Sequence, residues 1–172
     1  MKYFLIEADD RIPQPQFLDI HQILSPKMLT AKNSKSLPQV TTLKISHPKG
    51  LEFMDIISKP MFLISEPFME LVHTYDSNIQ IKHMVLFDGI NQRLSLYGLP
   101  ILEELECLDQ STVFDKGRIL KYEIILKSTF LNYSIFKITG LSKPHIVANL
   151  DLMESILRRE VLGIKITELE FC

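Results

Sequence analysis

The residues best suited to metal or nucleophilic chemistry are few, and their spacing matches none of the common sites. The histidines are His21, His47, His73, His83 and His145. None lies four residues from another, as two ligands on one helix face would, and none is next to a pair of cysteines. The glycines are scattered singly, so no glycine-rich phosphate loop is present. We therefore predict no catalytic, metal-ligating or cofactor-binding residue, and no cofactor.

A cluster of acidic residues is the strongest candidate for a binding site. Residues 51–110 carry ten acidic and three basic residues, although the whole chain has a net charge of only −2. Within this segment, four acids lie close together, at Glu103, Glu104, Glu106 and Asp109. Carboxylates that are neighbours in sequence need not lie on the two sides of a substrate, so we assign no acid–base catalysis to them. We interpret them as a partner-binding patch that would steer a basic protein surface into contact. A solvated face without a partner is the alternative.

Composition predicts a soluble globular protein and excludes several classes. The chain has 172 residues, of which 46% are hydrophobic and 23% charged, so it can bury a core. A dedicated nucleic-acid binder is usually strongly basic, and two cysteines do not make a disulfide-stapled scaffold. The apolar start of the chain is too short for a signal peptide, and no apolar run approaches the ~18 residues of a membrane span. We expect a cytoplasmic protein that binds neither nucleic acid nor a membrane.

The apolar periodicity predicts both strands and helices, and therefore an α+β fold in a single domain (1–172). We expect a variable N-terminal part at 1–50, with a mobile polar loop at 25–39, and a more regular core at 51–172. One helix should carry an apolar stripe at Phe68, Leu71, Val72 and Tyr75. Strands are expected at 2–7, 39–45, 61–64, 79–87, 94–97, 122–126 and 134–138, and a short helix at 17–24.

Residues 100–109 fit two structures. Ile101, Leu105 and Leu108 have helical spacing, and Pro100 would open such a helix. A short strand that ends at Asp109 is the alternative. The segment is too short for its periodicity to decide between them.

Two segments, 59–87 and 143–171, are alike when they are aligned. Lys59-Pro60 meets Lys143-Pro144, and Met69-Glu70 meets Met153-Glu154. Each segment reads as a strand, a polar cap, an amphipathic helix and a return strand. One such unit cannot bury its own helix face. We therefore predict two similar β-α-β modules on a shared mixed sheet, each with parallel strands.

The same segments resemble a known family. The similar stretches are FLISEPFMEL (62–71), ECLDQS (106–111), IFKITGL (135–141), PHIVANLDLMESI (144–156) and LGIKITELEF (162–171). They resemble the bacterial polymorphic-toxin immunity family called immunity protein eleven. The resemblance covers most of the chain and is clearest over 55–172, whereas the first 50 residues match little beyond the opening strand. Asn149 stands where the family usually has a serine cap, and asparagine caps a helix nearly as well.

This resemblance implies a non-enzymatic, cytoplasmic antidote that binds and blocks a cognate protein toxin. No catalytic residue comes with the family's motifs. The acidic middle of the chain would suit a basic toxin such as a nuclease. The alternatives are a regulatory or structural protein-interaction domain, or a small enzyme whose site is assembled from distant residues. An exposed binding surface is also compatible with a homodimer.

Overall fold

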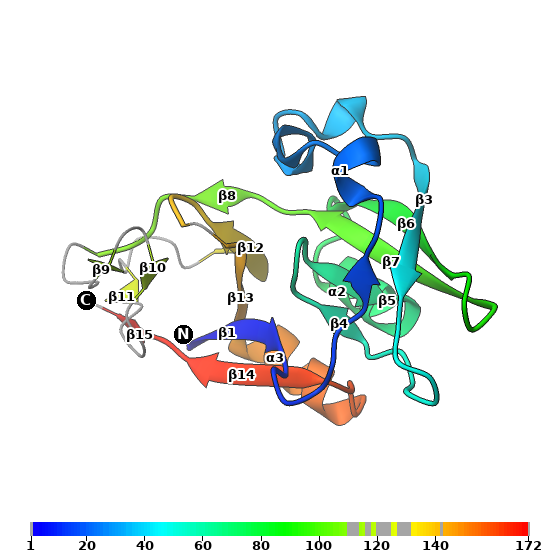
Figure 1. The fold of residues 1–172 in the computed structure, drawn as a ribbon. Helices are drawn as coiled ribbons and strands as arrows, with labels where there is room; N and C mark the ends of the chain where they lie inside the picture. Colours follow the sequence, from blue (N-terminus) through cyan, green and yellow to red (C-terminus); the bar gives the residue numbers. More distant parts are fainter. Residues whose placement is uncertain are drawn as a thin grey trace.

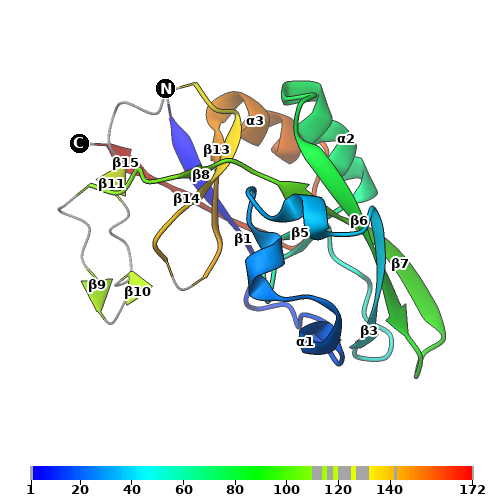
Figure 2. The same ribbon diagram turned by 90° about the horizontal axis from the view of Figure 1, so that it is seen from above.

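The fold is described by a computed structural model over residues 2–109, 114–115, 118–119, 125–126, 132–141 and 143–171. Within these residues the chain forms a mixed α+β fold, mostly strands, with two large sheets and three α-helices (Figure 1). The α+β prediction is therefore confirmed, whereas the single shared sheet is wrong. The two large sheets lie side by side in both views (Figures 1 and 2).

The larger sheet is built around a long hairpin. β6 (Gln80–Asp88) and β7 (Arg93–Ile101) pair antiparallel along their whole length, and their connection starts at Asp88-Gly89, a pair typical of turns. β3 (Val40–Ser46) lies parallel to β6 and buries alternate residues. The order of this six-stranded sheet is β2-β3-β6-β7-β5-β4. Its short strands are β2 (Gln16–Phe17), β4 (Ile56–Ile57) and β5 (Leu63–Ser65).

The second sheet joins the start of the chain to its last third. β1 (Tyr3–Ala8) runs antiparallel to both of its neighbours, β13 (His145–Asn149) and β14 (Ile164–Glu168). β12 (Ile135–Ile138) pairs antiparallel with β13, and β8 (Glu104–Leu105) pairs parallel with β12. The order of this five-stranded sheet is β14-β1-β13-β12-β8. The N-terminal strand is therefore an interior strand of the fold.

Two small ladders complete the strands. β9 (Phe114–Asp115) pairs antiparallel with β10 (Arg118–Ile119), and β11 (Ile125–Leu126) pairs parallel with β15 (Glu170–Phe171). The strand expected at 122–126 is seen at its last two residues, and the rest of it lies outside the described residues.

Two helices follow strands without an intervening loop. α2 (Glu66–Tyr75) follows β5 and buries Phe68, Leu71 and Val72 of the predicted stripe, with Tyr75 partly buried. α3 (Leu150–Arg158) follows β13 and buries Leu152, Met153 and Ile156. The Asn149 side chain caps α3, accepting a hydrogen bond from the Leu152 amide at 3.0 Å. The helices lie side by side over the sheets (Figure 2), where the Tyr75 hydroxyl donates to the Asp151 carbonyl at 2.9 Å.

The strands that flank each of these helices share a sheet and run parallel, but they are not adjacent. β7 lies between β5 and β6, and β1 lies between β13 and β14. Each inserted strand is antiparallel to both of its neighbours, which makes the flanking strands parallel to each other. Each helix therefore has a sheet of its own.

The N-terminal part contains short helical turns. α1 (Ile20–Ile23) forms where a short helix is predicted, and it buries Ile20. The segment expected as a loop at 25–39 contains two 3-10 helices, η1 (Pro26–Leu29) and η2 (Ser34–Ser36). Among the described residues, none of the helices combines the length and the apolar character needed to cross a membrane.

Residues 100–109 contain no helix, so the helix prediction is wrong; strand is present at 100–101 and 104–105, and no strand ends at Asp109 as the alternative expected. β7 continues through Pro100, which lies opposite Ile81 of β6. After Ile101 the chain leaves that sheet, and β8 joins the other one. Pairing with β6 and β12 outweighs the weak helical spacing, because tertiary context overrides local propensity over so few residues.

A central apolar cluster and one aspartate join the two sheets. The cluster packs Ile64 and Phe68 of one half against Ile6 and Ile146 of the other. Beside it, Asp55 accepts a hydrogen bond from the Ser65 hydroxyl at 2.5 Å and another from the Leu162 amide at 2.7 Å. Its backbone also bonds to both residues. Because Ser65 ends β5 and Leu162 precedes β14, Asp55 links the two sheets. Ser65 occupies the N-cap position of α2 but makes no side-chain cap bond.

We expect Asp55→Ala to lower the free energy of unfolding by about 2–3 kcal/mol, because it leaves two donors without a charged acceptor. Urea denaturation measures this loss. Asp10→Ala is the control, since Asp10 is 80% exposed and its change should be near neutral. Equal effects of the two substitutions would contradict the linking role of Asp55.

Gly98 is required where α2 crosses β7. A Cβ at Gly98 would lie 2.2 Å from the sulfur of Met69 and 2.6 Å from Cγ2 of Ile81. We expect Gly98→Ala to cost about 1–3 kcal/mol through overpacking, and to cost less in a Met69→Ala background. Chemical denaturation of the single and double variants measures both values. Gly89→Ala is the control, since its Cβ would approach only the ring of Phe87. An unchanged cost in the Met69→Ala background would refute this packing argument.

Candidate functional site

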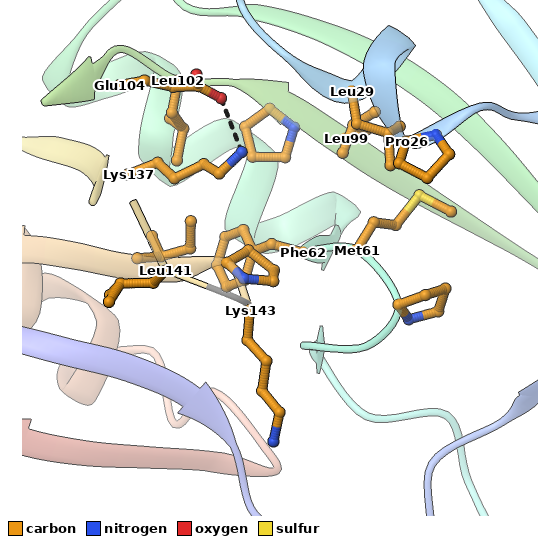
Figure 3. Close-up of a pocket in the computed structure, with 14 residues that line it drawn as sticks. Pro26, Leu29, Met61, Phe62, Leu99, Leu102, Glu104, Lys137, Leu141 and Lys143 are labelled. Atoms are coloured by element: carbon orange, nitrogen blue, oxygen red, sulfur yellow. Dashed lines mark hydrogen bonds and ion pairs between the residues drawn. The ribbon is translucent and has the colours of Figure 1, made fainter. Parts of the chain in front are cut away.

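A cleft lies where the chain passes from one sheet to the other. β7 ends at Ile101 and β8 begins at Glu104, so residues 102–103 bridge the sheets. The cleft next to this bridge has a volume of about 230 Å³ (Figure 3). Because it depends on the relative position of both sheets, no single element of the sequence contains it.

The walls of the cleft are mostly apolar. They include the buried side chains of Met61, Phe62 and Leu102, together with four prolines, at Pro26, Pro60, Pro100 and Pro144. Proline rings have few conformations to lose, so the walls are preorganised to receive an apolar group. The volume is somewhat below the usual range for drug-sized ligands and would suit one large side chain of a partner protein.

Three ionisable side chains line the cleft within the described part of the chain: Glu104, Lys137 and Lys143. The Lys137 ammonium donates to the Glu104 carboxylate at 2.7 Å, and each of these side chains is about one quarter exposed, at 27% and 25%. The pair connects β8 to β12 at the register position where these residues face each other. Figure 3 shows this pair at one wall, while the Lys143 side chain extends away from it.

The predicted acidic patch is divided by the fold. Glu103 and Glu106 are exposed, whereas the charge of Glu104 is matched by Lys137. Asp109 is half-buried and has interactions of its own. Cys107, between these acids, is fully buried. The structure therefore leaves Glu103 and Glu106 as the exposed acids of the segment that borders the cleft.

A polar cluster at the β6–β7 turn was not predicted from the sequence. The buried Asp88 carboxylate accepts hydrogen bonds from Asn91 at 2.7 Å and from Arg93 at 3.4 Å. The bond from Asn91 is the largest cause that lowers the pKa of Asp88 below its usual value. Arg93 also lies 5.0 Å from the ring centroid of Phe53, on which the His47 ring stacks. The Asp-Gly turn was the only sequence signal here.

These contacts fix the turn against residues 47–53. The Asn91 amide donates to the His47 carbonyl, and Arg93 donates to the Leu51 carbonyl at 2.8 Å. The polar side chains of this cluster therefore bond to the chain's own residues 47–53, and we interpret the cluster as structural. Where the structure describes the chain, no group of three or more His, Cys, Asp or Glu residues is arranged to hold a metal ion.

The sequence matches no model of a known protein family and no curated protein.

The Glu104–Lys137 pair should hold β8 against β12. We expect a double-mutant cycle with Glu104→Gln and Lys137→Met to give a coupling of about 0.5–1 kcal/mol, measured by urea denaturation. The Lys2–Glu168 pair is the control, since its side chains are 62% and 55% exposed and should couple more weakly. A coupling no larger than in the control pair would show that the ion pair does not secure the cleft wall.

Proposed function

We propose that this protein is a non-enzymatic immunity protein, which binds a cognate bacterial toxin domain and blocks it. The resemblance over 55–172 supports this function. The observation that carries it is an apolar cleft bordered by a segment with two exposed acids, Glu103 and Glu106. The combination suits protein recognition, because an apolar anchor provides affinity and surrounding charge provides steering.

The proposed mechanism is direct binding of a basic toxin surface. A large side chain of the toxin would enter the cleft, while Glu103 and Glu106 face its lysines and arginines. The charge of Glu104 is matched by Lys137, so Glu104 contributes to the cleft wall rather than to steering. A nuclease is the kind of toxin that would present such a basic surface. The antidote would act in the cytoplasm.

We also infer that the two β-α-β units, 59–87 and 143–171, are equivalent modules. The aligned residues and the shared arrangement around β7 and β1 support this inference. Equivalence would give the protein two similar halves, with the cleft between their sheets.

Toxin protection tests the proposed function. The tagged protein is purified from its own cells, the captured toxin domain is identified by mass spectrometry, and the domain is then coexpressed with each variant. We expect wild type to restore growth, and Glu103→Lys with Glu106→Lys to weaken toxin binding by about tenfold or more, because like charges then meet.

The control for this test is Glu154→Lys with Glu160→Lys. Both residues are exposed, on α3 and on the turn that follows it. These changes should leave toxin binding within about twofold of wild type. Failure to capture any toxin domain while toxin genes are expressed would count against the immunity function. If both charge reversals weakened toxin binding equally, the steering role of Glu103 and Glu106 would be refuted, but the immunity function would not.

A further inference from the structure

One face of the six-stranded sheet is covered along only part of its length. α2 covers the part where Met69 packs over Gly98 of β7 and Ile81 of β6. The helix begins next to Tyr97, because Ser65 pairs with Tyr97 in the sheet. The β6–β7 hairpin continues well past this end of α2 (Figure 2). From there to the turn, no described helix covers the same face.

Large apolar side chains occupy this uncovered part. Their exposed fractions are 56% for Val40, 38% for Phe87, 79% for Ile90, 67% for Leu94 and 41% for Leu96. Phe87 faces Leu94 across the hairpin, Leu96 shares the alternation of Gly98, and Val40 pairs with His83 of β6, so these four side chains belong to the face that α2 covers elsewhere. Ile90 lies in the turn at the end of the hairpin. We call these five residues the open face. Contiguous apolar patches on soluble proteins commonly mark interaction sites.

Opposite charges lie at opposite corners of the open face. Lys44 of β3 is exposed and pairs in register with Phe87, near the hairpin turn. Glu66 and Glu70 are exposed on the first two turns of α2, diagonally across the face from Lys44. A surface with this arrangement is complementary to itself, because a two-fold rotation exchanges the two corners.

We propose that the open face is the interface of a two-fold symmetric homodimer. The symmetry axis runs diagonally across the face, so that Lys44 of each copy meets Glu66 and Glu70 of the other copy. The two sheets then cross at roughly 90°, one of the two common geometries of sheet packing. The apolar side chains of the open face pack at the centre, and the charges lie at the rim.

The dimer leaves the cleft accessible. The cleft is lined by Leu99 and Pro100, near the end of β7 that leads to β8, whereas Leu94 and Leu96 of the open face lie toward the hairpin turn at the other end of the strand. The inference therefore does not depend on the proposed function. A protein without a toxin partner would still form this dimer, and a monomer could still bind a toxin.

Sedimentation equilibrium and light scattering over a range of micromolar concentrations test the proposal. We expect wild type to have twice the monomer mass and to dissociate on dilution. Leu94→Asp with Leu96→Asp should remain monomeric throughout. Leu157→Asp is the control, since Leu157 is 57% exposed on α3, outside the open face, and should stay dimeric. A monomeric wild type, or a control as monomeric as the double variant, would overturn the proposal.

A charge exchange separates dimer contacts from folding defects. Lys44→Glu alone, and Glu66→Lys with Glu70→Lys, should each weaken self-association by about tenfold or more. An equimolar mixture of the two should form a heterodimer about as stable as the wild-type dimer, since every charged contact is then complementary. Misfolded variants would not be rescued by mixing. Failure of the mixture to associate would exclude this two-fold arrangement.

Discussion

The position of the two sheets relative to each other is the constraint on which the rest of this protein depends. Among the described residues the large sheets share no strand, and they are held by the central apolar cluster and by polar links. Asp55 is the most connected of these links, because its carboxylate and its backbone bond to both Ser65 and Leu162. A charged acceptor that satisfies donors from two sheets fixes both distance and orientation.

This junction also determines where a partner could bind. The cleft exists because β7 and β8 belong to different sheets, and because the bridge between them crosses next to apolar walls. The open face exists because α2 is shorter than the hairpin it covers. The two surfaces lie at different ends of β7, the cleft near Leu99 and Pro100 and the open face near the hairpin turn. One chain can therefore present a site for a foreign partner and a site for its own copy without competition between them.

Several ionisable groups of the described residues serve structure. Asp88 and Arg93 are bound to their own turn, Glu104 is bound to Lys137, and Asp55 joins the sheets. The hydrogen bonds of these groups fix the elements that they join. The exposed acids and the apolar surfaces instead suit recognition of another protein, which is the basis of the proposed immunity function.

The sequence by itself determined those elements that depend on residues close to each other along the chain. The apolar stripe of α2, the Asn149 cap of α3 and the Asp88-Gly89 turn follow from side chains within a few residues of each other. Only the tertiary structure decided that the units use two sheets, that β1 and β7 are inserted between their strands, and that residues 100–101 and 104–105 join strands of different sheets. Each of these depends on hydrogen bonds between residues far apart in sequence, which periodicity does not report. The pairing of Glu104 with Lys137 has the same origin, so the sequence could place the acids together but could not show which of them remains exposed.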